Sequence, residues 1–238
     1  MSDALKSFSF AIILGIVCSL LLTTAATGLK KYQLRNIRID RQKNILKAVR
    51  LLDEKKTYTA DDIETLFTKN MRVLFVDHTG RIIQPDNRKP GDLPIWLYGE
   101  EDTVKAYVVP VDTNGLWGKI RGYLAFEADG VTVRGFTVFK HSETPGLGGE
   151  IEKRWFQKNF VGKKIVNAAG KFVSIGIAKG AVKNNIPREK RENYVDGISG
   201  ATMTGKFLSA GLKDILRNYE PVAIKFRRQQ CGKVTLCQ

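Results

Sequence analysis

The strongest hydrophobic signal in the chain lies close to its N-terminus. Positions 7–29 hold 23 consecutive residues without a charge. A helix of that length spans roughly 34 Å, which is enough to cross a hydrocarbon layer of about 30 Å. We therefore predict a single transmembrane helix over 7–29, preceded by a short tail over 1–6. A cleaved signal peptide is the alternative, because Lys6 precedes the apolar run and Ala25 and Ala26 stand near its end.

Two amphipathic patterns of helical spacing follow the apolar run. One begins after Asp40, which can cap a helix, and the other begins after Thr59. Their apolar positions are Ile45, Leu46, Val49 and Leu52 in the first pattern and Ile63, Leu66 and Phe67 in the second. We predict two helices that each bury one side.

Beyond position 70 the apolar residues occur in short runs or at alternate positions. Strands are predicted at 73–76, 82–83, 104–111, 120–126, 131–139 and 172–178. Asp129-Gly130 is typical of a hairpin turn between the fourth and fifth of these. Helical spacing returns over 151–160. The pattern indicates the α+β class: one domain over 30–228 with a mainly antiparallel sheet and packed helices, then a tail over 229–238.

Composition and charge exclude several classes of protein. With 43% hydrophobic and 26% charged residues, the chain is globular rather than disordered. The net charge is +15, and most of it falls within 151–238, where 18 basic residues stand against 6 acidic ones. Nucleic-acid binding explains this poorly, since the chain has a predicted span and no recognition motif. Three cysteines and two histidines leave few ligands for a soft metal, and no metal is expected.

A glycine-rich segment over 143–149 joins a predicted strand to the next helical pattern. It reads Glu143-Thr144-Pro145-Gly146-Leu147-Gly148-Gly149. Three glycines in four positions let backbone N–H groups approach a planar or phosphorylated ligand. The segment matches neither a Walker loop nor the dinucleotide-binding glycine pattern. A plain loop with a Pro-Gly turn is the alternative.

A second segment of interest precedes the most regular helical pattern of the chain. It reads Asp196-Gly197-Ile198-Ser199-Gly200-Ala201-Thr202, and a continuous apolar stripe follows over 203–219. Thr202 is therefore predicted to be the helix N-cap, and Thr204 lies inside the first turn. A phosphate would be well placed there, because helix N-termini present unpaired N–H groups and a partial positive charge. The alternative is that Thr202 only caps the helix.

The second segment resembles the flavinylation motif of FMN-binding domains, and the first is similar to that family's other signature. The resemblance implies that a transferase esterifies the phosphate of FMN onto Thr202, and that residues of the first segment line the isoalloxazine. A separate transferase agrees with the chemistry, because an unactivated threonine hydroxyl is a poor nucleophile. The cofactor-binding residues that we expect are Glu143, Thr144, Gly146, Leu147, Gly148, Ser199, Gly200, Ala201, Thr202 and, through its charge, Lys206.

The segment over 40–46 resembles the covalent-FMN subunit of the Na+-translocating NADH:quinone reductases more than the equivalent flavin subunit of Rnf-type complexes. The resemblance implies an electron-relay subunit with covalent FMN, with partner subunits and with no complete active site of its own. It also implies a bacterial inner membrane with the flavin domain on the periplasmic side. The basic residues just after the span, Lys30, Lys31, Arg35 and Arg38, favour the opposite orientation by the positive-inside rule.

Other interpretations stay open at this point. A membrane-anchored module that binds FMN as a sensor, or a structural subunit in which Thr202 is only a cap, would fit the same residues. Cys231 and Cys237 in the tail could form a disulfide, remain free or carry lipid. The basic residues Lys225, Arg227 and Arg228 could meet anionic lipid or a partner subunit, or could simply be solvated.

Overall fold

The computed structural model describes residues 3–53, 55–100 and 103–228. Contacts divide the chain into two units, one ending at Arg41 and the other beginning at Gln42. The tail over 229–238, with Cys231 and Cys237, lies outside the described residues.

The first unit consists of a single helix that continues into the second. Helix α1 runs without a break from Asp3 to Ala48, and its segment over 7–29 exposes nearly all of its apolar side chains. It is the one helix among the described residues that is long and apolar enough to cross a membrane. The prediction that Asp40 caps a new helix is wrong. Because no glycine or proline stands between 30 and 48, the helix simply propagates through Asp40.

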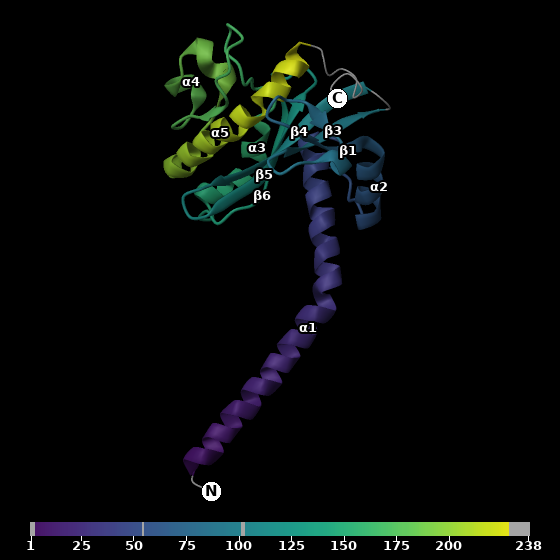
Figure 1. Ribbon diagram of the computed structural model, residues 1–238. Coiled ribbons are helices and arrows are strands. Elements are labelled where there is room, and N and C mark those ends of the chain that lie inside the picture. Colours follow the sequence, from purple (N-terminus) through teal and green to yellow (C-terminus); the bar gives the residue numbers. More distant parts are fainter. Residues whose placement is uncertain (1–2, 54, 101–102, 229–238) are drawn as a thin grey trace. The chain divides into compact units, whose positions relative to one another are not determined.

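The second unit is built on a six-stranded antiparallel sheet (Figure 1), as predicted. The strand order is β2-β1-β3-β4-β5-β6. The strands are β1 (Met71–Val76), β2 (Ile82–Ile83), β3 (Leu93–Glu100), β4 (Thr103–Asn114), β5 (Lys119–Glu127) and β6 (Val133–Lys140). Strand β3 was missed from the sequence because its central residues are buried on both faces, which removes the alternation that marks a half-exposed strand.

Two helical segments anchor the early part of this unit. The end of α1 packs against β6, where Arg134 Nε donates to the Val49 carbonyl at 2.7 Å and a Cβ at Gly135 would collide with the Ala48 carbonyl. Helix α2 (Ala60–Asn70) begins after Thr59, as predicted. Thr59 and Asp62 form a capping box, in which each side chain accepts the backbone N–H of the other.

The segment over 148–195 consists of short elements. They are η2 (Gly148–Glu152), α3 (Arg154–Lys158), β7 (Gly176–Ile177), α4 (Val182–Asn185), η3 (Arg188–Asn193) and β8 (Tyr194–Val195), with η1 (Pro85–Asn87) earlier in the chain. The predicted helix over 151–160 is therefore wrong in its extent, since a 3-10 turn and a five-residue helix occupy it. The predicted strand over 172–178 is reduced to β7, because Ser174 has a positive φ of 72° that interrupts an extended chain.

The long C-terminal helix α5 (Thr202–Arg227) lies along the sheet and contacts β4 (Figure 1). Its apolar stripe buries Leu208, Leu212, Leu216, Tyr219 and Phe226. The Tyr107 ring of β4 stacks with the rings of Phe126 and Phe226, with centroids 5.1 and 4.4 Å away. At about 1.5–3 kcal/mol for each large apolar side chain removed from water, this stripe fixes α5 on the sheet. This packing therefore fixes the position of the N-terminal end of α5 relative to the sheet.

Candidate functional site

The two segments singled out in the sequence meet at the start of α5. The Thr204 hydroxyl donates to Glu143 Oε2 at 2.5 Å. A Cβ at Gly148 would collide with Thr204 Oγ1, and one at Gly200 would lie 2.7 Å from the Leu147 side chain. The close approach at 148 explains why that position is glycine, and the positive φ of 74° explains the glycine at 200. The glycine-rich loop over 143–149 is therefore in direct contact with the turn over 196–201 and with the start of α5.

Glu143 ties this structure to a third segment. The residue is 4% exposed, and its Oε1 accepts the Trp117 N–H at 3.0 Å. Trp117 lies in the tight β4–β5 turn, which Gly115 N–H closes by donating to the Gly118 carbonyl at 2.6 Å. One carboxylate thus joins the β4–β5 turn, the glycine-rich loop and α5. We name this arrangement the Glu143 junction.

The β4–β5 turn is a part of the site that the sequence analysis missed. Leu116 and Trp117 are 42% and 67% exposed, although both are large and apolar. Two such side chains between the glycines of a hairpin turn are a signal that sequence reading could have used, since turns usually carry polar residues. Leu147 in the glycine-rich loop and Met203 in α5 are 43% and 45% exposed. Apolar surface therefore surrounds the junction, as is typical of a site that binds a ligand or partner.

The start of α5 differs from the prediction in one respect. The N-cap is Ala201, with no side-chain cap, and Thr202 is the first helical residue. Gly200 takes a positive φ of 74°, and the Ala201 carbonyl accepts the first helical bond from Gly205 N–H at 3.0 Å. The sharp Gly200 turn brings the chain into the helix one residue earlier than expected. Because the Ala201 side chain cannot accept a hydrogen bond, the first N–H groups of α5 remain available to bind an anion.

The two threonines at this helix end have different environments. Thr202 is exposed, whereas Thr204 is 2% exposed and holds Glu143. Lys206 is also exposed and lies one turn after Thr202, on the same side of the helix. A hydroxyl that must receive a bulky group has to be accessible, and of these two threonines only Thr202 meets that condition. Thr204 instead serves the Glu143 junction.

The remaining predicted residues shape the two segments through their backbone. The Thr144 carbonyl accepts both Leu147 N–H at 3.1 Å and Gly149 N–H at 2.9 Å, and Gly146 has a positive φ of 74°. The side chains of Thr144 and Ser199 are exposed.

The first two residues of the second segment anchor it to the rest of the domain. Asp196 Oδ1 accepts Val182 N–H at 2.6 Å, and Gly197 N–H donates to the Gly180 carbonyl at 2.8 Å. A Cβ at Gly197 would collide with the Ala178 carbonyl. These contacts therefore fix the backbone of the second segment where it leads into α5.

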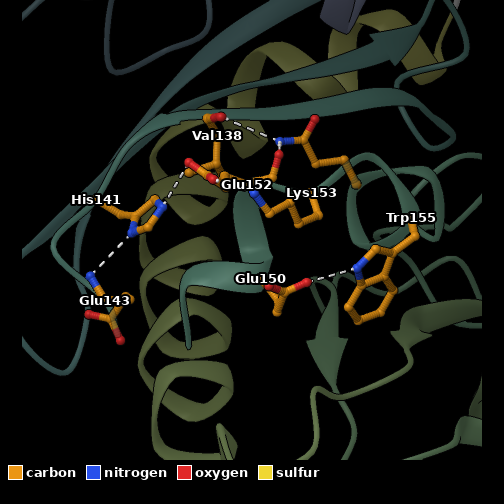
Figure 2. A network of polar contacts seen from close by, with 8 residues as sticks. Val138, His141, Glu143, Glu150, Glu152, Lys153 and Trp155 are labelled. Atoms are coloured by element: carbon orange, nitrogen blue, oxygen red, sulfur yellow. Dashed lines mark hydrogen bonds and ion pairs between the residues drawn. The ribbon is translucent and has the colours of Figure 1, made fainter. Parts of the chain in front are cut away.

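A polar network joins residues on either side of the glycine-rich loop in the chain (Figure 2). His141 Nδ1 accepts Glu143 N–H, and His141 Nε2 lies 3.1 Å from Glu152 Oε2. Lys153 and His141 hold the pKa of Glu152 below its usual range, mainly through hydrogen bonds to the carboxylate. Trp155 Nε1 donates to Glu150 at 3.1 Å. The network connects η2 to the end of β6 and to the Glu143 junction.

Comparison with known proteins identifies the family. The model of the FMN-binding domain matches residues 115–217, which include the β4–β5 turn, the glycine-rich loop and the start of α5. The NqrC subunit of the Na(+)-translocating NADH-quinone reductase from Haemophilus ducreyi is 34% identical to this chain, with 87% of each chain covered. The chain belongs to the NqrC family. The NqrC subunit of Vibrio campbellii is 31% identical, with 84% of this chain and 85% of the relative covered.

Solved structures of the family have the same fold. The crystal structure of the NqrC subunit from Parabacteroides distasonis aligns with a TM-score of 0.69 at 26% identity, covering 82% of this chain and 96% of that chain. NqrC from Shewanella oneidensis aligns with a TM-score of 0.62 at 22% identity, which shows the likeness in fold alone. The α+β class, the resemblance to this quinone-reductase subunit and FMN as the cofactor are confirmed.

The residues present fit the cofactor of this family. FMN has a planar aromatic ring system and a phosphate at opposite ends. The exposed side chains of Leu116, Trp117 and Leu147 offer apolar surface to the ring, and the uncapped N-terminus of α5 offers N–H groups to the phosphate. Within the described part of the chain, no group of three metal-ligating side chains is found.

Proposed function

We propose that this chain is the membrane-anchored flavoprotein subunit of a Na+-translocating NADH:quinone oxidoreductase and relays electrons through FMN esterified to Thr202. Membership of the NqrC family supports the complex, and the apolar segment of α1 supports the anchor. The observation that carries the attachment site is the contrast between the exposed Thr202 and the buried, hydrogen-bonded Thr204. The other subunits of the complex are its partners.

The residues around Thr202 have defined roles in this proposal. The phosphoester keeps a negative charge, which the N-terminus of α5 and Lys206 each stabilise by a few tenths to about 1 kcal/mol. Leu116, Trp117 and Leu147 contact the ring and shield it from water on the side of the β4–β5 turn. Bound FMN supplies the capacity to accept and donate electrons, and the protein sets its position.

Attachment requires a partner enzyme. The Thr202 hydroxyl is a weak nucleophile, and activation by a base is needed before it can attack a phosphorus atom. We assign this step to a separate flavin transferase, which reaches Thr202 because the side chain is exposed at the start of the helix. A chain produced without such an enzyme should therefore remain unmodified.

The flavin domain is proposed to lie on the periplasmic side of a bacterial inner membrane, with α1 in contact with lipid. The basic residues Lys30, Lys31, Arg35 and Arg38 oppose this orientation, but long translocated domains obey flanking charges weakly. Protease treatment of spheroplasts tests it. Cleavage of the domain before lysis supports the periplasmic side, and protection until lysis contradicts it.

The attachment is tested on the full chain isolated from a host that contains the transferase. We expect fluorescence of the protein band on a denaturing gel, and an intact mass greater than the polypeptide by FMN less one water. Thr202→Ala should abolish both signals, and the matched variant Thr204→Ala should keep them. Signals that survive in Thr202→Ala, or that vanish only in Thr204→Ala, would contradict the site.

The relay function needs a further measurement, because a sensor could also carry FMN. Membranes that contain the Thr202→Ala chain should retain the assembled complex and lose NADH-driven quinone reduction. Unchanged quinone reduction would show that this flavin lies outside the electron path.

A further inference from the structure

The imidazole of His141 lies between two groups that require opposite hydrogen-bonding roles. The side chain is 13% exposed and directly follows β6. Its Nδ1 accepts Glu143 N–H at 3.1 Å, and its Nε2 lies 3.1 Å from the Glu152 carboxylate (Figure 2). A backbone N–H can only donate, so Nδ1 must present a lone pair, and a carboxylate can only accept, so Nε2 must carry the proton. Both contacts are therefore made by a single tautomer of the neutral ring.

The charged groups that face this ring come from two segments. Glu143 belongs to the loop that follows it, and Glu152 comes from η2, where Lys153 Nζ shares the same carboxylate at 2.8 Å. The backbone of η2 also packs close, since a Cβ at Gly149 would lie 3.3 Å from His141 Cε1. The neighbouring Glu150 is engaged by Trp155. Glu152 accepts a hydrogen bond from Nε2–H, whereas Glu143 N–H requires Nδ1 to be unprotonated.

The bond to Nδ1 matters because of what Glu143 does. Its carboxylate is buried and receives Trp117 N–H and the Thr204 hydroxyl on its two oxygens. Both bonds depend on the backbone position of Glu143, since its carboxylate is 4% exposed and each of its oxygens is held by a donor from a different segment. A proton on Nδ1 would remove the acceptor for Glu143 N–H and place two donors against each other. The Glu143 junction would then lose the contact that orients it.

We propose that His141 is a positioning residue for the flavin site: its neutral imidazole holds the Glu143 junction together, and protonation of Nδ1 releases the junction. That FMN occupies this site rests on the proposed function. The coupling of His141 to Trp117 and Thr204 through Glu143 does not require FMN. The flavin environment therefore depends on pH through a residue that acts by way of Glu143.

Two substitutions at this position separate the roles of the ring nitrogens. His141→Asn places an amide oxygen near the site of Nδ1, where it accepts the N–H two residues on, as in an Asx-turn, and does not titrate. His141→Gln places its amide near the site of Nε2, keeps a donor for Glu152 and lacks the acceptor for Glu143. His141→Asn therefore keeps the contact with Glu143 N–H, and His141→Gln keeps the contact with the Glu152 carboxylate.

The first measurement is amide hydrogen exchange on the full chain in detergent, in a flavin-free Thr202→Ala background. At neutral pH the peptides that contain Trp117 and Glu143 should stay protected in wild type and in His141→Asn, and should lose protection in His141→Gln. On lowering the pH from about 8 to about 5, where imidazoles take up a proton, wild type should lose protection and His141→Asn should keep it. Protection of His141→Gln at neutral pH, or parallel loss in wild type and His141→Asn, would overturn the proposal.

The second measurement uses the FMN-loaded chain. The fluorescence of the bound flavin should change with pH in wild type and stay constant in His141→Asn. Because hydrogen exchange is read without flavin, a failure of the exchange pattern refutes the role of His141. An unmodified Thr202 with the expected exchange pattern would instead refute the proposed function.

Discussion

The hydroxyl of Thr204 donates to the Glu143 carboxylate at 2.5 Å, across 61 positions of sequence. The bond lies within the first turn of α5, two residues after the proposed attachment site. It assigns the two threonines of this helix end to different tasks: Thr204 fixes the glycine-rich loop, and Thr202 remains available at the surface. The geometry of the proposed cofactor site therefore depends on Thr204 as well as on the proposed attachment residue.

Thr204→Val should destabilise the domain and leave the attachment site intact. The substitution preserves shape but leaves the buried Glu143 oxygen without its donor, which costs about 1–3 kcal/mol. Thermal unfolding of the full chain in detergent measures this loss, and gel fluorescence should still report FMN. Thr204→Ser retains the hydroxyl and is the matched control. Equal unfolding temperatures for the valine variant and wild type would contradict the assigned role of the bond.

Gly148→Ala should disturb the Glu143 junction through a steric collision. The new Cβ would meet Thr204 Oγ1 and lie 2.8 Å from Glu143 Oε2, so the expected loss is about 1–3 kcal/mol. Gly146→Ala is the comparison, because its Cβ would meet no atom within 4 Å and only its positive φ costs about 1–2 kcal/mol. The free energy of unfolding is measured for each single variant and for each double variant that also carries Thr204→Ala.

The double variants distinguish the two glycines. Removing Thr204 Oγ1 relieves part of the collision at Gly148, so Gly148→Ala and Thr204→Ala should cost less together than the sum of their separate effects. Gly146→Ala and Thr204→Ala should be additive within about 0.5 kcal/mol. Additivity at both positions would show that Gly148 is not constrained by Thr204.

Tyr219→Phe should loosen the attachment of α5 to the sheet. The Tyr219 hydroxyl donates to the Pro94 carbonyl at 2.7 Å, a contact between α5 and β3. Losing it should cost about 1 kcal/mol, which corresponds to roughly 2–4 °C in unfolding temperature for a chain of this size. Tyr32→Phe is the control, because that ring is 66% exposed. A Tyr219→Phe chain as stable as the control would argue that the bond contributes nothing net.

Sequence reading succeeded where the information is local. The capping box of Thr59 and Asp62, the Asp129-Gly130 hairpin turn and the apolar stripe of α5 are each encoded within a few residues, and each is observed. It failed where a local signal was overridden. Asp40 is a good cap in isolation, yet an uninterrupted helix passes through it. The strand predicted over 172–178 is confined to Gly176–Ile177, because the positive φ of Ser174 interrupts the extended backbone before it.

By itself, the sequence determined the apolar segment of α1 that is long enough to span a membrane, the α+β class and the two segments that carry the family signatures, because hydrophobic period and motif spacing are properties of neighbouring residues. Only the tertiary structure decided that Glu143 joins Trp117, 26 positions before it, to Thr204, 61 positions after it. It also decided that His141 supports this junction and that Thr202, rather than Thr204, is exposed. Burial and hydrogen bonds between distant segments arise when the core packs α5 against the sheet, and no local pattern encodes them.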